Sequence, residues 1–329
     1  MNDIIIAVDI MGGDKAPIEI AKGAIAGAKE NGVKLLLCGA ESEIKNAIEQ
    51  FDGKNVVADT IFTDVFMTME DSPMFVMKEK VESSMSKAVT ALKNGEAHAV
   101  VSPGNTGALF TAASLTVRRI KGIRRAALGA VLPLEKPFLL LDSGANPSAL
   151  PENLEQFALL GSIYVEKVLG ISNPKVGLLN NGTEETKGNE LCLATLPLLK
   201  ELPINFIGNC EGRDLPCGVV DVAVCDGFTG NVTVKLIEGM GVFFKKKLNT
   251  MFYASPITKL SGLLVKPELK KLKKSIDHRE FGGAPFLGIA KPVIKAHGSS
   301  DARSIETCIK QAKLYYQSNV AEIISENQK

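Results

Sequence analysis

The stretch Val176-Gly-Leu-Leu-Asn-Asn-Gly-Thr-Glu-Glu-Thr-Lys-Gly-Asn-Glu190 decides the predicted fold. It begins as a short apolar run typical of a buried strand, and Asn180-Asn-Gly182 ends that run. Thr183 is a predicted helix cap, which places Lys187 one turn inside the next helix. In an open α/β sheet, such a strand-turn-helix connection favours an anion through its free N–H groups. An ordinary connection with solvated charges is the alternative.

Composition narrows the class of protein. A chain of 329 residues with 45% hydrophobic and 23% charged residues is globular, with room for one large α/β domain or two smaller ones. A net charge of +1 and the absence of tryptophan argue against nucleic-acid binding. The six cysteines form no CxxC pair and no signal peptide precedes Ile4, so we expect a reduced cytosolic chain. Because no apolar run approaches the roughly 18 residues of a membrane span, membrane contact is predicted to be peripheral.

A second glycine turn follows the first predicted strand, Ile4–Val8. Gly12 and Gly13 permit backbone angles that a side chain forbids, and the turn carries Asp9 and Asp14. The two aspartates are candidate metal ligands, but aspartates beside a Gly-Gly pair are more often turn formers. Helical and apolar segments then alternate toward residue 56, which predicts a parallel sheet.

Further turns of the same kind follow later predicted strands. In Ser102-Pro-Gly-Asn-Thr-Gly107, the polar side chains are predicted to bind an oxyanion and the glycines to let backbone amides approach it. Similar turns are Asp142-Ser-Gly-Ala-Asn146, Asp226-Gly-Phe-Thr-Gly-Asn231 and His297-Gly-Ser299, where the histidine either contacts a ligand or caps a helix. If these turns share one edge of the sheet, as we expect, they form a cleft for an anionic, phosphate-bearing ligand.

Residues 242–278 depart from this pattern. Apolar residues at near-helical spacing alternate with many lysines, which predicts an amphipathic helical hairpin. Such a hairpin fits a membrane surface with anionic lipid, a second subunit, or both. The apolar residues expected to make these contacts are Phe252, Leu260, Leu263, Leu264 and Val265.

The turns together resemble a known family. They include Ala7-Val-Asp-Ile-Met-Gly-Gly-Asp14, Ser102-Pro-Gly-Asn-Thr-Gly107, Leu141-Asp-Ser-Gly-Ala-Asn146, Gly182-Thr-Glu-Glu-Thr-Lys-Gly-Asn-Glu190, Asp226-Gly-Phe-Thr-Gly-Asn231 and Lys295-Ala-His-Gly-Ser-Ser-Asp301. In this order, they closely resemble the bacterial PlsX-type phosphate acyltransferases of phospholipid synthesis. The resemblance covers essentially the whole chain. This chain departs from the family at Pro103, where alanine is usual, and in the run from Lys78 to Ser84.

The resemblance implies a reaction in which acyl-[acyl carrier protein] and inorganic phosphate give acyl phosphate and free carrier protein. It implies a single three-layer α/β/α domain over residues 1–329 with a mostly parallel central sheet, similar to phosphotransacetylases and to isocitrate and isopropylmalate dehydrogenases. It further implies a homodimer, no redox cofactor or metal, and a cytoplasmic protein peripherally associated with the cell membrane. There, a membrane glycerol-3-phosphate acyltransferase would use the acyl phosphate for phosphatidic acid synthesis.

Because phosphate is itself the nucleophile in that reaction, the protein needs no activated serine or cysteine. The expected catalytic residues are Lys187, which orients phosphate or neutralises developing charge, His297, which is a candidate proton donor to the thiolate, and Asn231. Lys78 and Lys80 are candidate docking residues for an acidic carrier protein. The predicted phosphate- and substrate-binding residues are Asp9, Gly12, Gly13, Asp14, Ser102, Gly104, Asn105, Thr106, Asp142, Gly144, Asn146, Gly182, Glu184, Asn189, Asp226, Gly227, Gly298 and Ser299.

Three other functions remain open at this point. A phosphotransacetylase-like enzyme would use acyl-coenzyme A as its donor. A metal-dependent dehydrogenase would share the fold, but its aspartate cluster and basic Lys/Tyr pair have no recognisable place in this sequence. A non-catalytic anion sensor that recruits partners to membranes would need the turns and the hairpin but no turnover.

Overall fold

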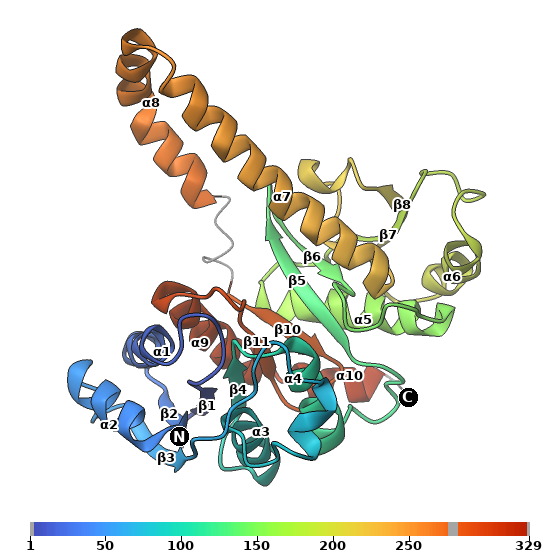
Figure 1. Cartoon of the computed structure of the whole chain (residues 1–329). Helices are drawn as coiled ribbons and strands as arrows, with labels where there is room; N and C mark the ends of the chain where they lie inside the picture. The colour runs from blue at the N-terminus through green and yellow to red at the C-terminus, as the bar shows by residue number, and fades with distance from the viewer. Residues whose placement is uncertain (1–2, 276–281, 328–329) are drawn as a thin grey trace.

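The computed structural model describes residues 3–275 and 282–327 and has one central sheet with helices on both faces (Figure 1). The 11 strands lie in the order β3-β2-β1-β4-β11-β10-β5-β6-β9-β7-β8. Their bounds are β1 Ile5–Asp9, β2 Lys34–Gly39, β3 Val57–Phe62, β4 Ala99–Ser102, β5 Ala127–Pro133, β6 Pro137–Leu141, β7 Val176–Asn180, β8 Phe206–Glu211, β9 Val222–Val224, β10 Ala284–Leu287 and β11 Val293–Lys295.

The sheet consists of two parallel halves that run in opposite directions. β3, β2, β1, β4 and β11 are parallel to one another, as are β6, β9, β7 and β8. Between the halves, β11 pairs with β10, β10 with β5, and β5 with β6, each time antiparallel. Three reversals invert the direction, so the carboxyl ends of the two halves lie at opposite edges of the sheet.

Helices cover both faces, which confirms the predicted three-layer α/β/α fold. One face packs against α1 Ile18–Asn31, α2 Glu41–Gln50, α5 Pro151–Val168, α6 Glu190–Lys200, α9 Ala302–Gln317 and α10 Val320–Asn327. The other packs against α3 Ser84–Asn94, α4 Thr106–Ala112, the short helices η1 Pro73–Met77 and η2 Ala113–Val117, and the first part of α7 Gly227–Phe252. The remaining helices are η3 Leu215–Cys217 and α8 Pro256–Ser275.

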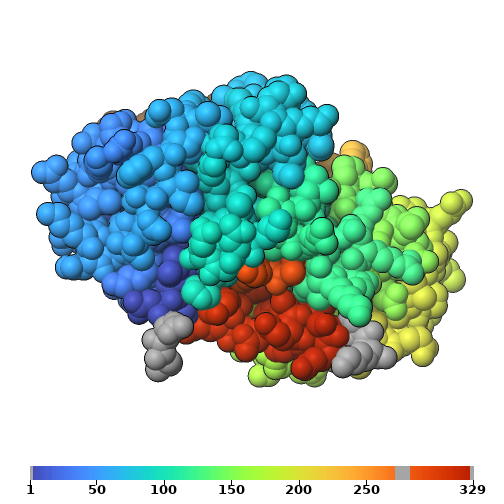
Figure 2. All heavy atoms as spheres, turned by 90° about the horizontal axis from the view of Figure 1, so that it is seen from below, coloured from blue at the N-terminus to red at the C-terminus, as the bar shows by residue number. Residues whose placement is uncertain are grey.

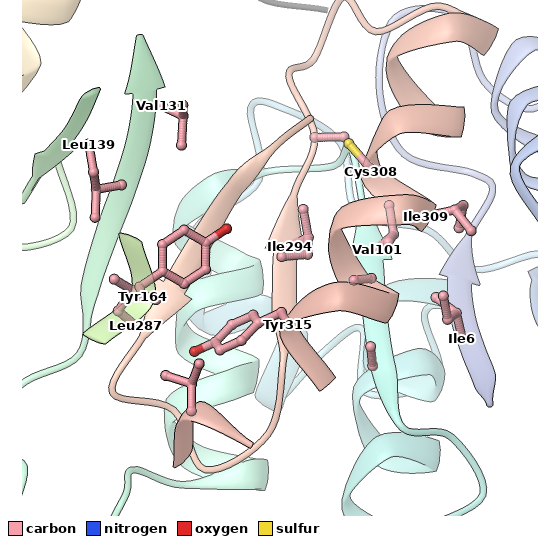
Figure 3. Close-up of a cluster of buried hydrophobic side chains, with 14 of the residues drawn as sticks. Ile6, Val101, Val131, Leu139, Tyr164, Leu287, Ile294, Cys308, Ile309 and Tyr315 are labelled. Atoms are coloured by element: carbon pink, nitrogen blue, oxygen red, sulfur yellow. The ribbon is translucent and has the colours of Figure 1, made fainter. Parts of the chain in front are cut away.

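The largest apolar cluster joins the two halves of the sheet (Figure 3). It contains Ile6 and Val101 from the first half and Leu139 from the second, all fully buried. Tyr164 of α5 and Tyr315 of α9 meet edge to face, with ring centroids 5.3 Å apart. Because aliphatic strands and aromatic helix residues share one cluster, the relative position of the two carboxyl edges is fixed by packing.

A helical hairpin projects from the body (Figure 1). Its first helix, α7, begins at Gly227 in the body and runs without a break to Phe252, so the predicted start at residue 242 has no counterpart as a helix boundary. The second helix, α8, returns from Pro256, and residues 276–278 of the predicted hairpin lie outside the described residues. Among the described helices, none is long and apolar enough to cross a membrane.

Candidate functional site

The predicted turns form two groups rather than one. Loop cluster 1 comprises residues 9–14, 102–106 and 297–299, which follow β1, β4 and β11. Loop cluster 2 comprises residues 142–146, 181–189 and 226–231, which follow β6, β7 and β9. The expectation of a single edge is therefore wrong, because the antiparallel strands β10 and β5 invert the second half. β4 and β6 are four strand spacings apart, or about 19 Å.

In loop cluster 1, the turns after β1 and β4 are in backbone contact. A Cβ on Gly12 would lie 2.7 Å from the Cα of Gly104, so only glycine fits there. Ser102 Oγ donates to Asp9 Oδ2 at 2.7 Å and Ser84 Oγ donates to Oδ1 at 2.6 Å. Burial raises the pKa of Asp9, and the two hydroxyl hydrogen bonds oppose that shift. Asp9 and Ser102 thus hold the turns together from inside.

Lys295 lies beneath the same turns and was absent from the predicted site residues. Its Nζ donates to the carbonyls of Pro103, at 3.2 Å, and Ala296, so it joins the turn after β4 to the one after β11. Burial lowers the pKa of Lys295 to about 8, and the carboxyls of Asp9 and Asp14 oppose that shift. In the sequence, the sign that Lys295 has a structural role is its position at the end of an apolar strand.

The side-chain amide of Asn105 is fully hydrogen-bonded to backbone groups of the protein. Its Nδ2 donates to the carbonyls of Thr68, Met69 and Asp71 at 3.4, 3.2 and 3.1 Å, and its Oδ1 accepts from Ala108 N at 3.0 Å as the cap of α4. The side chain therefore has no donor left for an oxyanion, contrary to the prediction from sequence. Thr106, the next residue, is the first of α4 and is partly exposed.

His297 and Ser299 are exposed at the surface of loop cluster 1. Ser299 N donates to His297 Nδ1 at 3.2 Å, and Ser299 Oγ lies 2.9 Å from the same atom. Because a backbone amide only donates, Nδ1 is the acceptor and the neutral ring carries its proton on Nε2. Gly298 O accepts from Asp14 N at 2.8 Å, and Gly13, with φ of 86°, lies against the same carbonyl.

In loop cluster 2, the Asp142 carboxylate organises the turn after β6. Its Oδ1 accepts from Leu128 N, Gly144 N and Ala145 N at 3.1, 3.0 and 2.9 Å. Its Oδ2 accepts from the backbone N and the Nδ2 of Asn146 at 2.6 and 2.7 Å. The side chain is fully buried, so both Asp142 and Asn146 build the turn and face inward.

The first turn of α7 closes over that loop. Asp226 caps the helix by accepting from Phe228 N and Thr229 N at 3.0 and 2.9 Å. Gly227 N donates to Asn146 O at 2.8 Å. Asn231 is exposed, and its Nδ2 donates to Ser143 O at 3.3 Å beside Gly144. Asn231 is thus held at the rim of loop cluster 2.

The central stretch folds differently from the prediction. Asn189, not Thr183, caps α6, with its Oδ1 accepting from Cys192 N at 2.9 Å. Lys187 therefore lies in the loop before the helix, and Asn180 Nδ2 donates to its carbonyl at 3.1 Å. The side chain of Lys187 packs on Gly182, is exposed, and has no hydrogen-bond or ionic partner among the described residues. Glu184 is also exposed, and its carbonyl accepts from Asn209 at 2.9 Å.

A hollow of about 310 Å³ lies where the starts of α6 and α7 converge. It has a partly apolar wall and a polar rim, formed by Leu154, Leu179, Asn180, Asn181, Asn189, Leu191, Cys192, Cys225, Asp226 and Thr229. Lys187 does not line the hollow itself, but Asn180, which does, binds the Lys187 carbonyl. Burial raises the pKa of both thiols, Cys192 and Cys225, so neither is an activated nucleophile. The starts of α6 and α7 both open onto the hollow, where Asn189 caps the first helix and Asp226 caps the second, and the remaining backbone amides of the two first turns favour an anion.

The structure thus brings Lys187 and Asn231 to one edge of the sheet and His297 to the other. Within residues 3–275 and 282–327, no group of three or more His, Cys, Asp or Glu side chains is arranged to hold a metal ion. Asp9 and Asp14 act in the chain as turn residues, with Asp14 N bound to Gly298 O.

Comparison with known proteins agrees with these motifs. A family model described as "Fatty acid synthesis protein" matches residues 4–323. The "Phosphate acyltransferase" of Desulfitobacterium hafniense strain Y51 is 47% identical over 321 residues, which cover 97% of this chain and 96% of that protein. The chain belongs to the phosphate acyltransferase family. A second phosphate acyltransferase, from Clostridium botulinum strain Loch Maree, is 44% identical over 98% of this chain and 97% of its own length.

Solved structures show that this chain shares its fold with other proteins. A phosphotransacetylase from Streptococcus pyogenes aligns with a TM-score of 0.63 at 16% identity, covering 95% of this chain and 94% of its own. A branched-chain phosphotransacylase from Enterococcus faecalis aligns with a TM-score of 0.59 at 15% identity, covering 95% and 99%. At these identities the likeness establishes the fold alone. The enzyme class, acyltransferase, comes from the family.

Proposed function

We propose that the protein transfers a long-chain acyl group from acyl-[acyl carrier protein] to inorganic phosphate and so supplies acyl phosphate for phospholipid synthesis. Membership of the phosphate acyltransferase family supports acyl transfer to phosphate. One structural observation carries the choice of site: Lys187 is exposed, has no hydrogen-bond or ionic partner among the described residues, and lies in a loop bound by Asn180, which lines the hollow at the starts of α6 and α7. We assign the reacting groups to loop cluster 2 alone.

In the proposed mechanism, phosphate binds beside Lys187, and one of its oxygens attacks the thioester carbon. In this assignment, backbone amides at the starts of α6 and α7 and the Asn231 amide at the rim of loop cluster 2 donate to the tetrahedral oxyanion. The carbon–sulfur bond breaks, the acyl phosphate leaves, and the thiolate takes its proton from water. His297 follows β11 in loop cluster 1, so it is not assigned to the same transition state.

The test is acyl phosphate formation, trapped with hydroxylamine, from long-chain acyl carrier protein or long-chain acyl-coenzyme A, each with and without phosphate. We expect phosphate-dependent product from the carrier-protein donor. Preference for acyl-coenzyme A would instead favour the phosphotransacetylase-like function, for which the fold shared with the Streptococcus pyogenes enzyme is the supporting observation. Absence of product from both donors would refute acyl transfer and favour an anion sensor.

We further propose two roles for the exposed apolar residues of α7 and α8. Near the body, Phe228, Val232 and Leu236 of α7 are 67%, 54% and 64% exposed and recur at four-residue spacing, which suits a second subunit. Toward the tip, Leu260 and Leu264 of α8 are 62% and 76% exposed, which suits peripheral contact with anionic lipid. The exposed residues of α7 near the body thus support a homodimer. Those of α8 near the tip support peripheral association with a membrane.

Phe252 differs from the other residues predicted for hairpin contact. It is partly buried, and a Cβ on Gly262 would lie 3.1 Å from its ring. Its ring therefore packs between α7 and α8 and holds the hairpin closed, while Leu260, Leu263, Leu264 and Val265 remain exposed.

Leu260→Glu together with Leu264→Glu is expected to abolish flotation of the protein with anionic vesicles, because two buried charges oppose insertion of the apolar tip. The mass in solution, measured by light scattering, should stay at twice the 35.1 kDa chain. Leu193→Glu, on the exposed side of α6, is the matched control and should float as the wild type does. Absence of wild-type binding would leave the hairpin as a dimer element, and a wild-type monomer would refute the homodimer.

A further inference from the structure

Residues 118–125 form an exposed loop, here called the basic loop, between η2 and β5. Its sequence, Arg-Arg-Ile-Lys-Gly-Ile-Arg-Arg, has five cationic residues among eight and no acidic one. All five cationic side chains are exposed. The net charge of the whole chain is only +1, so this concentration of positive charge is local and not a consequence of composition.

The basic loop has a fixed shape. Ile120 and Ile123 are each only 5% exposed and anchor it in the body. Ile120 N donates to Gly288 O at 2.9 Å. Gln156 of α5 binds the loop from the other side, accepting from Arg124 N at 2.8 Å and donating to Gly122 O at 2.9 Å. A pre-organised loop loses little conformational entropy when a partner binds it.

Four of the five cationic side chains have no carboxylate partner among the described residues. In the described part of the chain, Arg124 is the one cation of the five with a carboxylate partner, Glu152, at 3.8 Å. The side chains of Arg118 and Lys121 make no hydrogen bond or ion pair there. Arg118 also has φ of 74° and ψ of 172°, a conformation that glycine takes without strain. Backbone hydrogen bonds hold that conformation, because Arg118 N donates to Ala113 O at 3.0 Å and Arg118 O accepts from Ala290 N at 2.9 Å.

The basic loop borders loop cluster 2. Arg125 donates to Ser148 O at 3.3 Å, and Asn146 Nδ2 donates to Ala126 O at 2.8 Å. Glu152, the partner of Arg124, lies in the first turn of α5, and Leu154 of the same helix lines the hollow. Figure 2 shows the teal and green atoms of this part of the chain exposed on the face seen from below, whereas the hairpin projects upward in Figure 1.

We propose that the basic loop is the docking surface for the acidic carrier protein that brings the acyl thioester to loop cluster 2, an inference that rests on the proposed function. Arginine matches carboxylates on a partner helix through paired hydrogen bonds. A lipid surface fits less well, because both isoleucines of the loop are buried and the hairpin tip lies at the other end of the molecule (Figure 1). Lys80, a docking candidate from sequence, is already paired with Asp71 at 2.5 Å.

The experiment measures acyl phosphate formation by the full chain with two donors, a palmitoyl carrier protein and the uncharged palmitoyl-pantetheine. For Arg118→Glu with Lys121→Glu, we expect KM for the carrier-protein donor to rise about tenfold or more. Turnover at saturation and kinetics with palmitoyl-pantetheine should not change. Arg118→Gly, which removes the charge and the backbone strain together, is a second variant and should show a smaller rise. Lys22→Glu with Lys54→Glu, two exposed lysines elsewhere, is the control with the same change in charge.

The outcomes separate the two proposals. If the Arg118→Glu/Lys121→Glu variant folds and its KM for the carrier-protein donor is unchanged, the docking surface is refuted. The proposed function is not affected by that result. Equal losses with palmitoyl-pantetheine would instead place the loop in the catalytic site. Loss of vesicle binding with unchanged KM would identify a lipid surface. A wild-type protein that uses palmitoyl-pantetheine but not the carrier-protein donor would refute the proposed donor, and the docking surface with it.

Discussion

Lys187→Ala is expected to lower the rate of acyl phosphate formation by about a hundredfold or more. Lys187 is an exposed cation in the loop that is bound by Asn180, a residue lining the hollow, so in the proposed mechanism its removal leaves the charge developing on phosphate and oxyanion unbalanced. Lys187→Arg, which keeps the charge, should recover part of the rate. Initial rates at saturating phosphate and donor measure both effects.

Lys175→Ala is the matched control. Lys175 is also exposed and precedes β7, so it stands at the other end of the strand that Lys187 follows. Its loss should leave both the rate and the melting temperature unchanged. A Lys187→Ala protein that folds and retains a near-normal rate would remove Lys187 from the mechanism.

Asp142→Ala is expected to lower the free energy of unfolding by about 3–4 kcal/mol. The carboxylate accepts four backbone N–H groups and the Asn146 amide in a fully buried position, and alanine leaves all these donors without a partner. Activity should fall with it, because Gly227 and the start of α7 rest on the same turn. Unfolding in urea at fixed pH measures the loss.

Asp64→Ala, which removes an exposed carboxylate outside both loop clusters, should cost less than about 0.5 kcal/mol. If Asp142→Ala cost no more than this control, the turn would have to be held by its backbone alone. Asp142 would then return to the list of candidate ligand contacts.

Local patterns made the turns predictable. Glycines and aspartates after apolar runs correctly placed turns at Gly12, Asp142 and Asp226, because turn formation depends on neighbouring residues. That these three residues bind phosphate or substrate stays a prediction. The helix start after β7 was misplaced by several residues, since Thr183 and Asn189 are both acceptable caps. The choice between them depends on the bond from Asn180 to the Lys187 carbonyl, which sequence spacing does not reveal.

Strand direction was the information that the sequence did not carry. β5 combines Gly129 and Pro133 with apolar residues, which weakens its strand pattern, and it was not predicted at all. Without β5 and its antiparallel neighbours, six similar turns naturally suggest one edge. The roles of Asn105 and Lys295 were hidden for a related reason, because each depends on contacts between segments distant in sequence.

The position of β10 and β11 has a consequence for the chain during synthesis. These strands, residues 284–295, are the lateral link between β4 and β5, which do not pair with each other. A nascent chain that has emerged only to residue 283 therefore carries two unsatisfied strand edges, one on each half, and such edges are prone to association with other chains. The two halves become one sheet only as the last part of the chain leaves the ribosome, so protection of the growing chain matters most immediately before that moment.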